Sequence, residues 1–360
     1  MDYSLECNDA RRRSTNGRTR NQLLGGATAL ASVGLGLASY AAFREPMRIK
    51  LDRLTLRVPS AQGRLPKRGL RILHLTDTHF RGADWRETPK LEEIRRLTAH
   101  MEYEVLIHTG DFLHNDEGLP NMLKLLDLLP KPRLASLAVL GNHDYMRYSA
   151  REMFGRSWAS FNELEKSAGV NGNGSFASPF HRVGRLIAFG RYFANTPLDL
   201  KRTGTNDTSA LMDELAARDI QVLNNRHIRL TGDVGKDDCV DLYIAGIDDL
   251  TEGSPSLQGA LANIPPAAPT LLLSHNPDIV AESGIEQADV VLSGHTHGGQ
   301  IVLPGIGPAH THSECLTRSE ASGYLRRGTT QVYISRGIGE GIPLRFAAAP
   351  QIALITLIPG

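Results

Sequence analysis

Short hydrophobic runs alternate with amphipathic stretches over most of this chain. The runs are mostly apolar over three to seven residues, a pattern typical of buried strands. The stretches 88–101 and 121–129 instead repeat apolar residues at helical spacing, and the first opens with a possible cap, Thr88, and a proline at the first helical position. The predicted strands are 71–76, 105–109, 137–140, 242–247, 271–274, 291–293, 332–335 and 352–358. Strands and helices alternating in this way predict consecutive right-handed βαβ units, and hence an α/β fold.

The first 45 residues have a different pattern from the rest. Residues 1–20 are polar and contain five arginines, and the stretch 23–43 is uncharged and rich in Ala, Gly and Leu. About 20 apolar residues can cross a bilayer, so this stretch is long enough to do so. Its mild hydrophobicity favours a signal sequence or signal anchor over a strong stop-transfer helix. A twin-arginine export signal and a buried core helix are the alternatives.

The charges around this apolar stretch bear on its orientation. The arginines before it predict a cytoplasmic N-terminus, with the body of the chain (46–360) outside the cytoplasm. A second basic group follows the stretch and weakens that prediction; it comprises Arg44, Arg48, Lys50 and Arg53. We therefore expect membrane association through residues 1–45, with the body on the extracytoplasmic side.

Residues 150–208 interrupt the alternation of strands and helices. They contain an aromatic-rich stretch at 154–161, the sequence NGNGS at 171–175 and several basic residues. We interpret them as an insertion that forms a cap over a site. A solvated excursion without a role is the alternative.

Composition excludes several classes of protein. The chain has 360 residues, enough for a large core, and 40 Lys and Arg against 39 Asp and Glu. This balance, without a groove pattern of Arg and aromatic residues, argues against a nucleic-acid partner. The three cysteines have no paired spacing, which speaks against a disulfide framework and a thiolate zinc site. We expect a monomer.

Residues that commonly bind metals directly follow five of the predicted strands. A lone histidine after a strand is more often a core or surface residue, and we place His74 and His108 in that class. We interpret His310 and His312 as loop residues, and His181 and His227 carry no signal. The five patches are Asp77 and His79 in TDTH, Asp111 in TGDF, Asn142, His143 and Asp144 in GNHD, His275 in SHNPD, and His295 and His297 in GHTHGG. Since the carboxyl ends of parallel strands converge, the patches together predict a two-metal hydrolytic site.

The types of residue in these patches indicate the chemistry. Carboxylate, imidazole and amide ligands form a mixed oxygen and nitrogen shell, which suits Mn, Fe or Zn better than Mg or Ca alone. We expect two divalent ions, with Mn favoured and Asp111 as the bridging carboxylate. Two cations about 3.5–4 Å apart hold a water as hydroxide and neutralise a phosphoryl oxygen during attack. His143 lies beside Asn142 and, with an unperturbed pKa of about 6.5, is suited to act as the general acid.

Taken together, the motifs over about residues 70–300 resemble those of the calcineurin-like metallophosphoesterases. The resemblance implies a four-layer α/β/β/α sandwich with metals at the strand ends. It also implies that Asp77, His79 and His297 bind the first metal, and that Asn142, His275 and His295 bind the second. Asp111 would bridge both ions, His143 would be the acid, and Asp144 would support the site.

Two further stretches, 298–307 and 333–346, resemble the bacterial membrane-associated branch of this family. That branch includes phosphodiesterases and an enzyme of lipid A synthesis that cleaves the pyrophosphate of UDP-diacylglucosamine. The resemblance implies a phosphorylated small-molecule or lipid-linked substrate at a membrane. A UDP-linked precursor would instead place the body on the cytoplasmic face. Two competing functions are a non-catalytic metal-binding scaffold of this fold and a nuclease, the latter disfavoured by the balanced charge.

Two aspects of the predicted site stay open in the sequence. Some family members place an aspartate three residues after the bridging aspartate to orient the catalytic histidine. Here that position is His114, with Asp116 two residues later, so either is a candidate for the role. Arg336 and Arg345 are candidates for phosphate contacts, because a guanidinium matches phosphate oxygens; ordinary surface ion pairs are the alternative.

Overall fold

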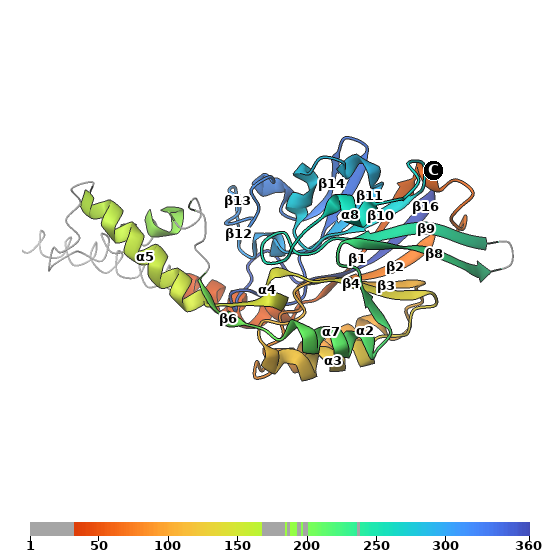
Figure 1. Ribbon diagram of the computed structural model, residues 1–360. Helices are drawn as coiled ribbons and strands as arrows, with labels where there is room; N and C mark the ends of the chain where they lie inside the picture. The colour runs from red at the N-terminus through yellow and green to blue at the C-terminus, as the bar shows by residue number, and fades with distance from the viewer. Residues whose placement is uncertain (1–31, 168–183, 186–187, 193–195, 197–200, 236–237) are drawn as a thin grey trace, which may run out of the picture.

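Two six-stranded sheets form the centre of the molecule (Figure 1). The structure is a computed structural model, and it describes residues 32–167, 184–185, 188–192, 196, 201–235 and 238–360. The first sheet, in spatial order, contains β1 (Lys50–Val58), β16 (Gln351–Pro359), β2 (Leu70–Leu75), β3 (Val105–Thr109), β4 (Ala135–Val139) and β7 (Ile220–Val222). The second contains β14 (Gly323–Arg327), β15 (Thr330–Ile334), β11 (Val290–Ser293), β10 (Thr270–Leu273), β9 (Asp238–Gly246) and β8 (Arg226–Gly235).

Both sheets are largely parallel, as the sequence predicts. In the first sheet β2, β3, β4 and β7 run parallel, and only the β16–β2 pair is antiparallel within it. In the second, β9, β10, β11 and β15 run parallel, while the two edge strands β8 and β14 are antiparallel to their neighbours. Every strand predicted from the sequence is present, and the α/β prediction is confirmed.

Apolar side chains fill the space on both faces of each sheet. Between the sheets lies a core that includes Ile72, Ile107, Leu271 and Leu292, all with no exposed surface. Burying such a side chain stabilises the fold by about 1.5–3 kcal/mol. The outer face of the first sheet packs against α2 (Glu87–Thr98), α3 (Leu119–Leu128) and α7 (Thr208–Ala216). The second packs against α8 (Leu257–Leu261), η5 (Pro277–Ala281) and η6 (Ile285–Gln287), so the layers follow the order helix, sheet, sheet, helix.

Short elements connect these layers at the carboxyl end of the parallel strands. They are η4 (Asp116–Gly118), α4 (Asn142–Tyr145), η7 (His297–Gly299), β12 (Val302–Leu303), β13 (Gly307–Pro308) and η8 (Arg318–Glu320). Of these, α4 and η7 begin directly at predicted metal ligands. The short η3 (Pro59–Ala61) follows β1 at the opposite end, because β1 and β16 run antiparallel to β2.

The predicted insertion leaves and rejoins the body through a two-stranded base. Strand β5 (Met146–Tyr148) pairs with β6 (Arg202–Thr205), and α5 (Ala150–Ser167) then extends away from the sheets (Figure 1). The rings of Trp158 and Phe161 contact Phe189, and the Arg185 guanidinium lies 5.3 Å from the Trp158 ring centroid. The insertion therefore has an aromatic cluster of its own. NGNGS (171–175) and His181 lie outside the described residues, and a role as a cap stays a prediction.

The N-terminal segment is fastened to the body close to the predicted boundary at residue 45. Residues 32–39 are helical and continue into η1 (Tyr40–Arg44) and η2 (Glu45–Met47). The Arg345 N–H donates to the Ala41 carbonyl at 2.8 Å, and the Ala347 N–H donates to the Glu45 carboxylate at 2.9 Å. In the part of the chain that is described, no helix has both the length and the apolar character needed to cross a bilayer. Residues 1–31, which contain the arginines and the start of the apolar stretch, lie outside it.

These contacts predict where the chain tolerates truncation. Deleting residues 1–31 leaves Ala41 and Glu45 in place, so we expect an unchanged melting temperature. Deleting residues 1–45 removes both acceptors, and we expect the melting temperature to fall by a few degrees, since each hydrogen bond contributes about 1 kcal/mol. Thermal unfolding of the two truncated proteins checks this. Equal melting temperatures of the two truncated proteins would show that residues 32–45 do not stabilise the body of the chain.

Candidate active site

Five loops at the carboxyl end of the strands bring all seven predicted ligand residues together. Each loop follows a strand whose apolar side chains are buried, so the polar residue at its end emerges at the same edge of the sheets. Six of the seven side chains are buried and His295 is half-buried. The ligands are Asp77 and His79 after β2, Asp111 after β3, Asn142 after β4, His275 after β10, and His295 and His297 after β11.

The ligand atoms form two groups that share one carboxylate. In the first, His79 Nε2 lies 3.1 Å from His297 Nε2 and 3.3 Å from Asp111 Oδ2. Asp77 Oδ1 lies 3.8 Å and 3.7 Å from the same two imidazole nitrogens.

In the second group, His275 Nε2 lies 3.2 Å from Asp111 Oδ2. His295 Nδ1 lies 3.2 Å from His275 Nε2 and 3.1 Å from Asn142 Oδ1. Asp111 Oδ2 therefore belongs to both groups, as a bridging ligand must.

These distances fit the donor atoms of two coordination shells. Donor atoms about 2.1 Å from one ion, at tetrahedral or octahedral angles, lie roughly 3.0–3.4 Å from one another. The distances among the other donors fall in this range, and Asp77 Oδ1, at 3.7 and 3.8 Å, lies somewhat farther out. Burial lowers the pKa of His79 and of His297 well below the ordinary value, so both are neutral and can offer a lone pair.

Backbone carbonyls select the nitrogen atoms that face the second group. His275 Nδ1 lies 2.7 Å from the Thr109 carbonyl, and His295 Nε2 lies 3.1 Å from the His312 carbonyl. A carbonyl only accepts, so these two nitrogens carry the protons and leave His275 Nε2 and His295 Nδ1 free for an ion. Such outer partners are typical of metal-binding histidines. The residues present therefore fit two divalent ions.

The backbone at the ligands is strained. Five of the seven have φ in the left-handed region, which costs roughly 1–3 kcal/mol for a residue other than glycine. They are Asp77 (49°), His79 (47°), Asp111 (55°), His295 (69°) and His297 (51°). This conformation turns the side chains of each i, i+2 pair toward one point. The cost is offset by surrounding contacts such as the His295 N–H, which donates to both Asp77 carboxylate oxygens at 3.0 Å.

Two glycines let the loops approach the ligand carboxylates. A Cβ on Gly294 would lie 2.1 Å from Asp77 Oδ2, and a Cβ on Gly141 would lie 2.3 Å from Asp111 Oδ1. Both distances are far below van der Waals contact. The first glycine of GHTH and that of GNHD are thus required because a larger residue would leave no room for the Asp77 and Asp111 carboxylates.

We expect Gly294→Ala to displace the Asp77 carboxylate and to lose the ion of the first group. Metal content should then fall from about two toward one per chain, because Asp77 Oδ1 lies 3.8 and 3.7 Å from the two imidazole nitrogens of the first group. Elemental analysis of the purified variant checks this. Gly341→Ala is the matched control, since its Cβ would meet no atom closer than 3.8 Å. Two retained ions in Gly294→Ala would contradict the steric argument.

Asp144 joins the loop that carries Asp111 to the loop that carries Asn142. Its Oδ2 accepts from the Asp111 and Gly141 N–H groups, both at 2.9 Å, and its Oδ1 accepts from the Leu113 N–H at 3.2 Å. The contacts place Asp144 behind the ligands, in the supporting position expected from the sequence.

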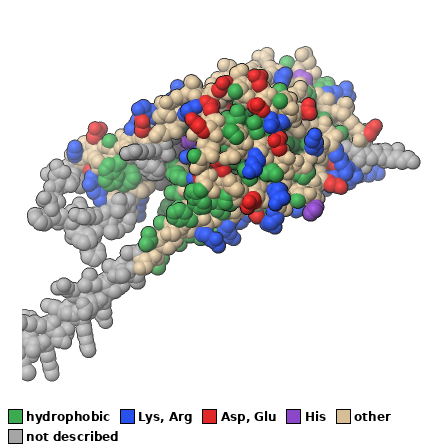
Figure 2. Space-filling view, turned by 90° about the horizontal axis from the view of Figure 1, so that it is seen from below, with side chains coloured by type: hydrophobic (Ala, Val, Ile, Leu, Met, Phe, Trp, Pro, Cys, Tyr) green, Lys and Arg blue, Asp and Glu red, His purple; other side chains and the backbone are tan. Residues whose placement is uncertain are grey.

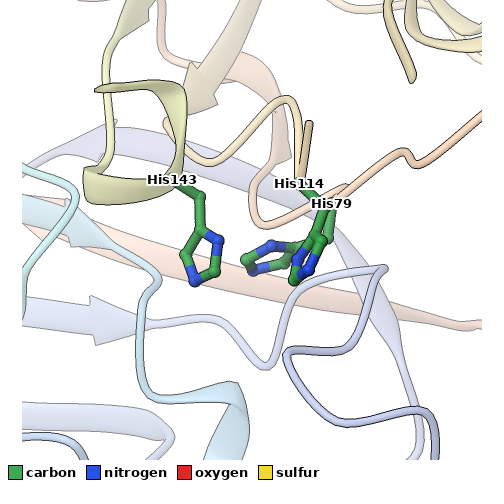
Figure 3. A group of neighbouring side chains, drawn as sticks. All are labelled: His79, His114 and His143. Carbon is green, nitrogen blue, oxygen red and sulfur yellow. The ribbon is translucent and has the colours of Figure 1, made fainter. Parts of the chain in front are cut away.

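His143 lies beside the shared carboxylate without contributing its ring to either group. Its N–H donates to Asp111 Oδ1 at 2.8 Å. Its ring centroid lies 4.5 Å from that of His79, 4.8 Å from that of Tyr148 and 5.1 Å from that of His114. Figure 3 shows the imidazoles of His143, His114 and His79 grouped together. Burial lowers the pKa of His143, so a neighbouring anion is needed to hold its proton.

Of the two candidates for orienting His143, only His114 contacts its ring. The His114 imidazole stacks on His143 with an interplanar angle of 28°. Asp116 instead pairs with Arg147 and accepts from the Asp207 N–H at 2.8 Å. A stacked imidazole thus occupies the position three residues after Asp111.

The two arginines proposed for phosphate contacts lie in the loop framework. The Arg345 guanidinium is fully buried, donates to the carbonyls of Arg336 and Ala348, and lies 3.4 Å from His297 Nδ1. Arg336 Nε donates to the Ala349 carbonyl at 2.9 Å. Neither residue lines the cavity described below, and phosphate binding by them stays a prediction.

A cavity of about 1300 Å³ opens beside Asn142 and His295. Most of its lining carries no signal in the sequence, because these residues come from the insertion and from loops without a motif. His310 and His312 are loop residues, as expected, yet they also line this space. Its wall contains four basic side chains, Arg156, Lys201, Arg202 and Arg318, and three acidic ones, Glu252, Asp278 and Glu314.

The other histidines set aside in the sequence lie away from the ligands' coordinating atoms. His74 Nε2 lies 2.9 Å from Thr109 Oγ1, and His108 stacks on Phe112 at 3.7 Å, both in the core. His227 Nδ1 lies 2.9 Å from the Ala260 carbonyl. The contacts of His74 and His108 agree with the structural role expected for them.

Two adjoining ligand groups with a shared aspartate, at the strand ends of a double-sheet α/β fold, define a class of dinuclear metal hydrolases. The chain belongs to the calcineurin-like phosphoesterase family, whose model matches residues 70–299. It is therefore a metal-dependent phosphoester hydrolase, and members of this family bind two divalent metal ions. The predicted resemblance is confirmed, and membership favours an enzyme over a non-catalytic scaffold.

Several curated proteins are similar to this chain. The UDP-2,3-diacylglucosamine pyrophosphatases LpxG of Chlamydia muridarum and Chlamydia trachomatis are 28% and 29% identical, each over 86% of this chain and 90% of the relative. The uncharacterized metallophosphoesterase YkuE of Bacillus subtilis is 39% identical over 32% of this chain and 40% of its own length. These relatives support the bacterial branch indicated by the sequence.

Proposed function

We propose that this enzyme hydrolyses the pyrophosphate bond of a lipid-linked nucleotide, with UDP-2,3-diacylglucosamine as the substrate. The observation that carries this proposal is the cavity of about 1300 Å³ that directly adjoins the second ligand group and has four basic side chains in its wall. Its volume exceeds the roughly 300–1,000 Å³ of ordinary ligand sites, which suits a large substrate better than a simple phosphate ester. The names of the two chlamydial relatives, which match nearly full-length, point to the same substrate class.

The residues of the site divide the work of this reaction. When bound, the two ions would polarise a phosphoryl oxygen and lower the pKa of a water molecule. Asp111 holds both ligand groups at a fixed separation. His143 donates a proton to the leaving oxygen, and the negative phosphate beside it raises its pKa enough to keep that proton available. We propose Mn as the metal, with Fe or Zn as alternatives, because the donors mix oxygen and nitrogen.

Two ion pairs hold basic side chains in the cavity wall. Arg202 Nε donates to Glu252 at 2.8 Å, and Glu252 also accepts from the Tyr148 hydroxyl. Lys201 Nζ lies 2.6 Å from the Glu152 carboxylate. These pairs position cations from the insertion near the ligand groups, where a diphosphate would lie. The cavity wall thus gives the insertion a part in substrate binding.

We further propose that the enzyme acts at a membrane, held there by residues 1–45. The described part of this segment lies at the same end of the molecule as α4 and α5 (Figure 1), so an anchor in front of it would bring the ligand groups toward the bilayer. A UDP-linked lipid precursor is cytoplasmic, and the basic group after the apolar stretch is compatible with a cytoplasmic body. We therefore place the active site on the cytoplasmic face for this substrate.

The test is a Mn-supplemented assay of the full chain in detergent micelles. We expect UDP-2,3-diacylglucosamine to yield UMP and 2,3-diacylglucosamine 1-phosphate, the products of pyrophosphate cleavage. A simple phosphomonoester and a soluble phosphodiester are assayed beside it. Turnover of the soluble diester without cleavage of the lipid would retain the reaction class and overturn the substrate.

A matched pair of variants tests the cavity. Arg202→Gln removes a cation from the wall, so the KM for the UDP-lipid should rise while turnover of a small diester changes little. Arg229→Gln is the control, because it also pairs with an acidic residue, Asp241, but on the outer edge of the second sheet. Equal effects of both variants on both substrates would remove the cavity from the proposal.

A further inference from the structure

An exposed aromatic pair lies where the N-terminal segment meets the body. The rings of Phe43 and Trp85 stack with centroids 6.2 Å apart and an interplanar angle of 30°. Their exposed fractions are 57% and 59%. Large apolar side chains with this exposure usually mark a contact surface when they are clustered. This pair joins residues that are distant in sequence, so the tertiary fold creates the cluster.

The cluster continues along the described N-terminal helix. Val33, Leu35 and Leu37 are each about half exposed or more. The chain before them is uncharged back to Asn21. Figure 2 shows hydrophobic side chains gathered where this segment leaves the body, with basic side chains beside them.

Basic and aromatic side chains border the apolar cluster. Arg44, Arg48 and Lys50 are exposed, and the Arg48 guanidinium donates to the Tyr40 hydroxyl at 2.8 Å. Aromatic rings and cations concentrate at the interface between bilayer and water, where the rings lie at headgroup level and the cations attract anionic lipids. A second copy of the chain would not need this combination of charge and apolar surface.

The cluster is held firmly in relation to the ligand groups. Trp85 lies in the loop that follows His79, and this loop is fixed by the Glu87 carboxylate, which accepts from the Arg81 N–H at 2.6 Å. In the N-terminal segment, the Ala41 carbonyl accepts from the backbone N–H of Arg345. The Arg345 guanidinium lies 3.4 Å from His297 Nδ1. The orientation of the cluster thus sets the orientation of the active site.

We infer that Phe43, Trp85 and the exposed side chains of residues 33–37, with Arg44, Arg48 and Lys50, form a docking surface for an anionic phospholipid bilayer. It rests on the membrane placement proposed above and extends it from the N-terminal segment to the catalytic body. Docking holds the active-site end at headgroup level, so a lipid-linked substrate can present its pyrophosphate without leaving the bilayer.

Trp85 provides the test, because Trp158 is the other of the two tryptophans in the chain. Full-length Trp158→Phe is mixed with vesicles of phosphatidylcholine and phosphatidylglycerol that carry brominated acyl chains. We expect a blue shift and a strong loss of Trp85 emission. The control carries Lys67→Trp with both native tryptophans changed to Phe; Lys67 is exposed before β2, at the opposite end, and its emission should not change.

A charge variant completes the test. Arg44→Glu should weaken the quenching of Trp85 in phosphatidylglycerol vesicles, whereas Arg95→Glu on the exposed face of α2 should not. Unchanged Trp85 emission on adding vesicles would overturn the inference. So would a blue shift without lipid that grows with protein concentration, which would identify a second copy as the occupant. Turnover of a soluble phosphodiester, measured on the same samples, reports the proposed chemistry separately.

Discussion

Asp111→Asn should lose metal from both groups and lower turnover by at least about 10³-fold. Asp111 Oδ2 lies 3.3 Å from His79 Nε2 and 3.2 Å from His275 Nε2, so it contacts both ligand groups. Its Oδ1 accepts from the His143 N–H, which would orient the asparagine oxygen toward that donor. The amide NH₂ would then point at the ions. The partially positive hydrogens of the amide would then stand in place of a shared negative oxygen and would repel both cations.

Elemental analysis of the purified variant measures this effect apart from activity. We expect well below one metal per chain, whereas a change confined to one shell, such as Asn142→Ala, should retain about one. Asp289→Asn is the matched control: its carboxylate accepts from the Thr270 N–H at the amino end of β10, far from the ligands. A fully loaded Asp111→Asn protein would refute the bridge.

His143→Ala should retain two metals per chain and lose about 10²–10⁴-fold in turnover of substrates with a poor leaving group. The metals remain because the backbone N–H of residue 143 still donates to Asp111, and the ring belongs to neither ligand group. Turnover falls because the leaving oxygen departs without a proton. This result separates a proton donor from a ligand.

The leaving group provides the sharper measurement for His143. A p-nitrophenyl ester, whose oxygen leaves readily as an anion, should lose far less activity in His143→Ala than the corresponding alkyl ester. His227→Ala, at a histidine of β8 whose ring contacts the Ala260 carbonyl of α8, should change neither. Equal losses on both esters would assign His143 a structural role.

The strands that were predicted from the sequence lie in the interior of the two six-stranded sheets. The four strands of these sheets that the sequence did not predict are all at the edges. β1, β7, β8 and β14 are the outermost strands of the two sheets. An interior strand is covered on both faces and reads as a continuous apolar run. An edge strand such as β1 has charged residues at exposed positions, for example Lys50 and Arg53, which break that run. Periodicity alone therefore locates the centre of each sheet but not its margin.

The residue types and their order determine the ligands of this site by themselves. Each ligand follows a buried strand, and parallel strands have a common carboxyl end. The ligands therefore converge because of the hydrophobic pattern of the strands and the parallel topology that this pattern predicts. Only the tertiary structure decides what surrounds them. The left-handed backbone at the ligands, the stacking of His114 on His143 and the pairing of Asp116 with Arg147 depend on contacts between distant loops. The cavity beside Asn142 and His295 and the Phe43–Trp85 surface likewise combine segments with no common motif. Such contacts depend on how loops pack in three dimensions, and no periodicity in the chain encodes that packing.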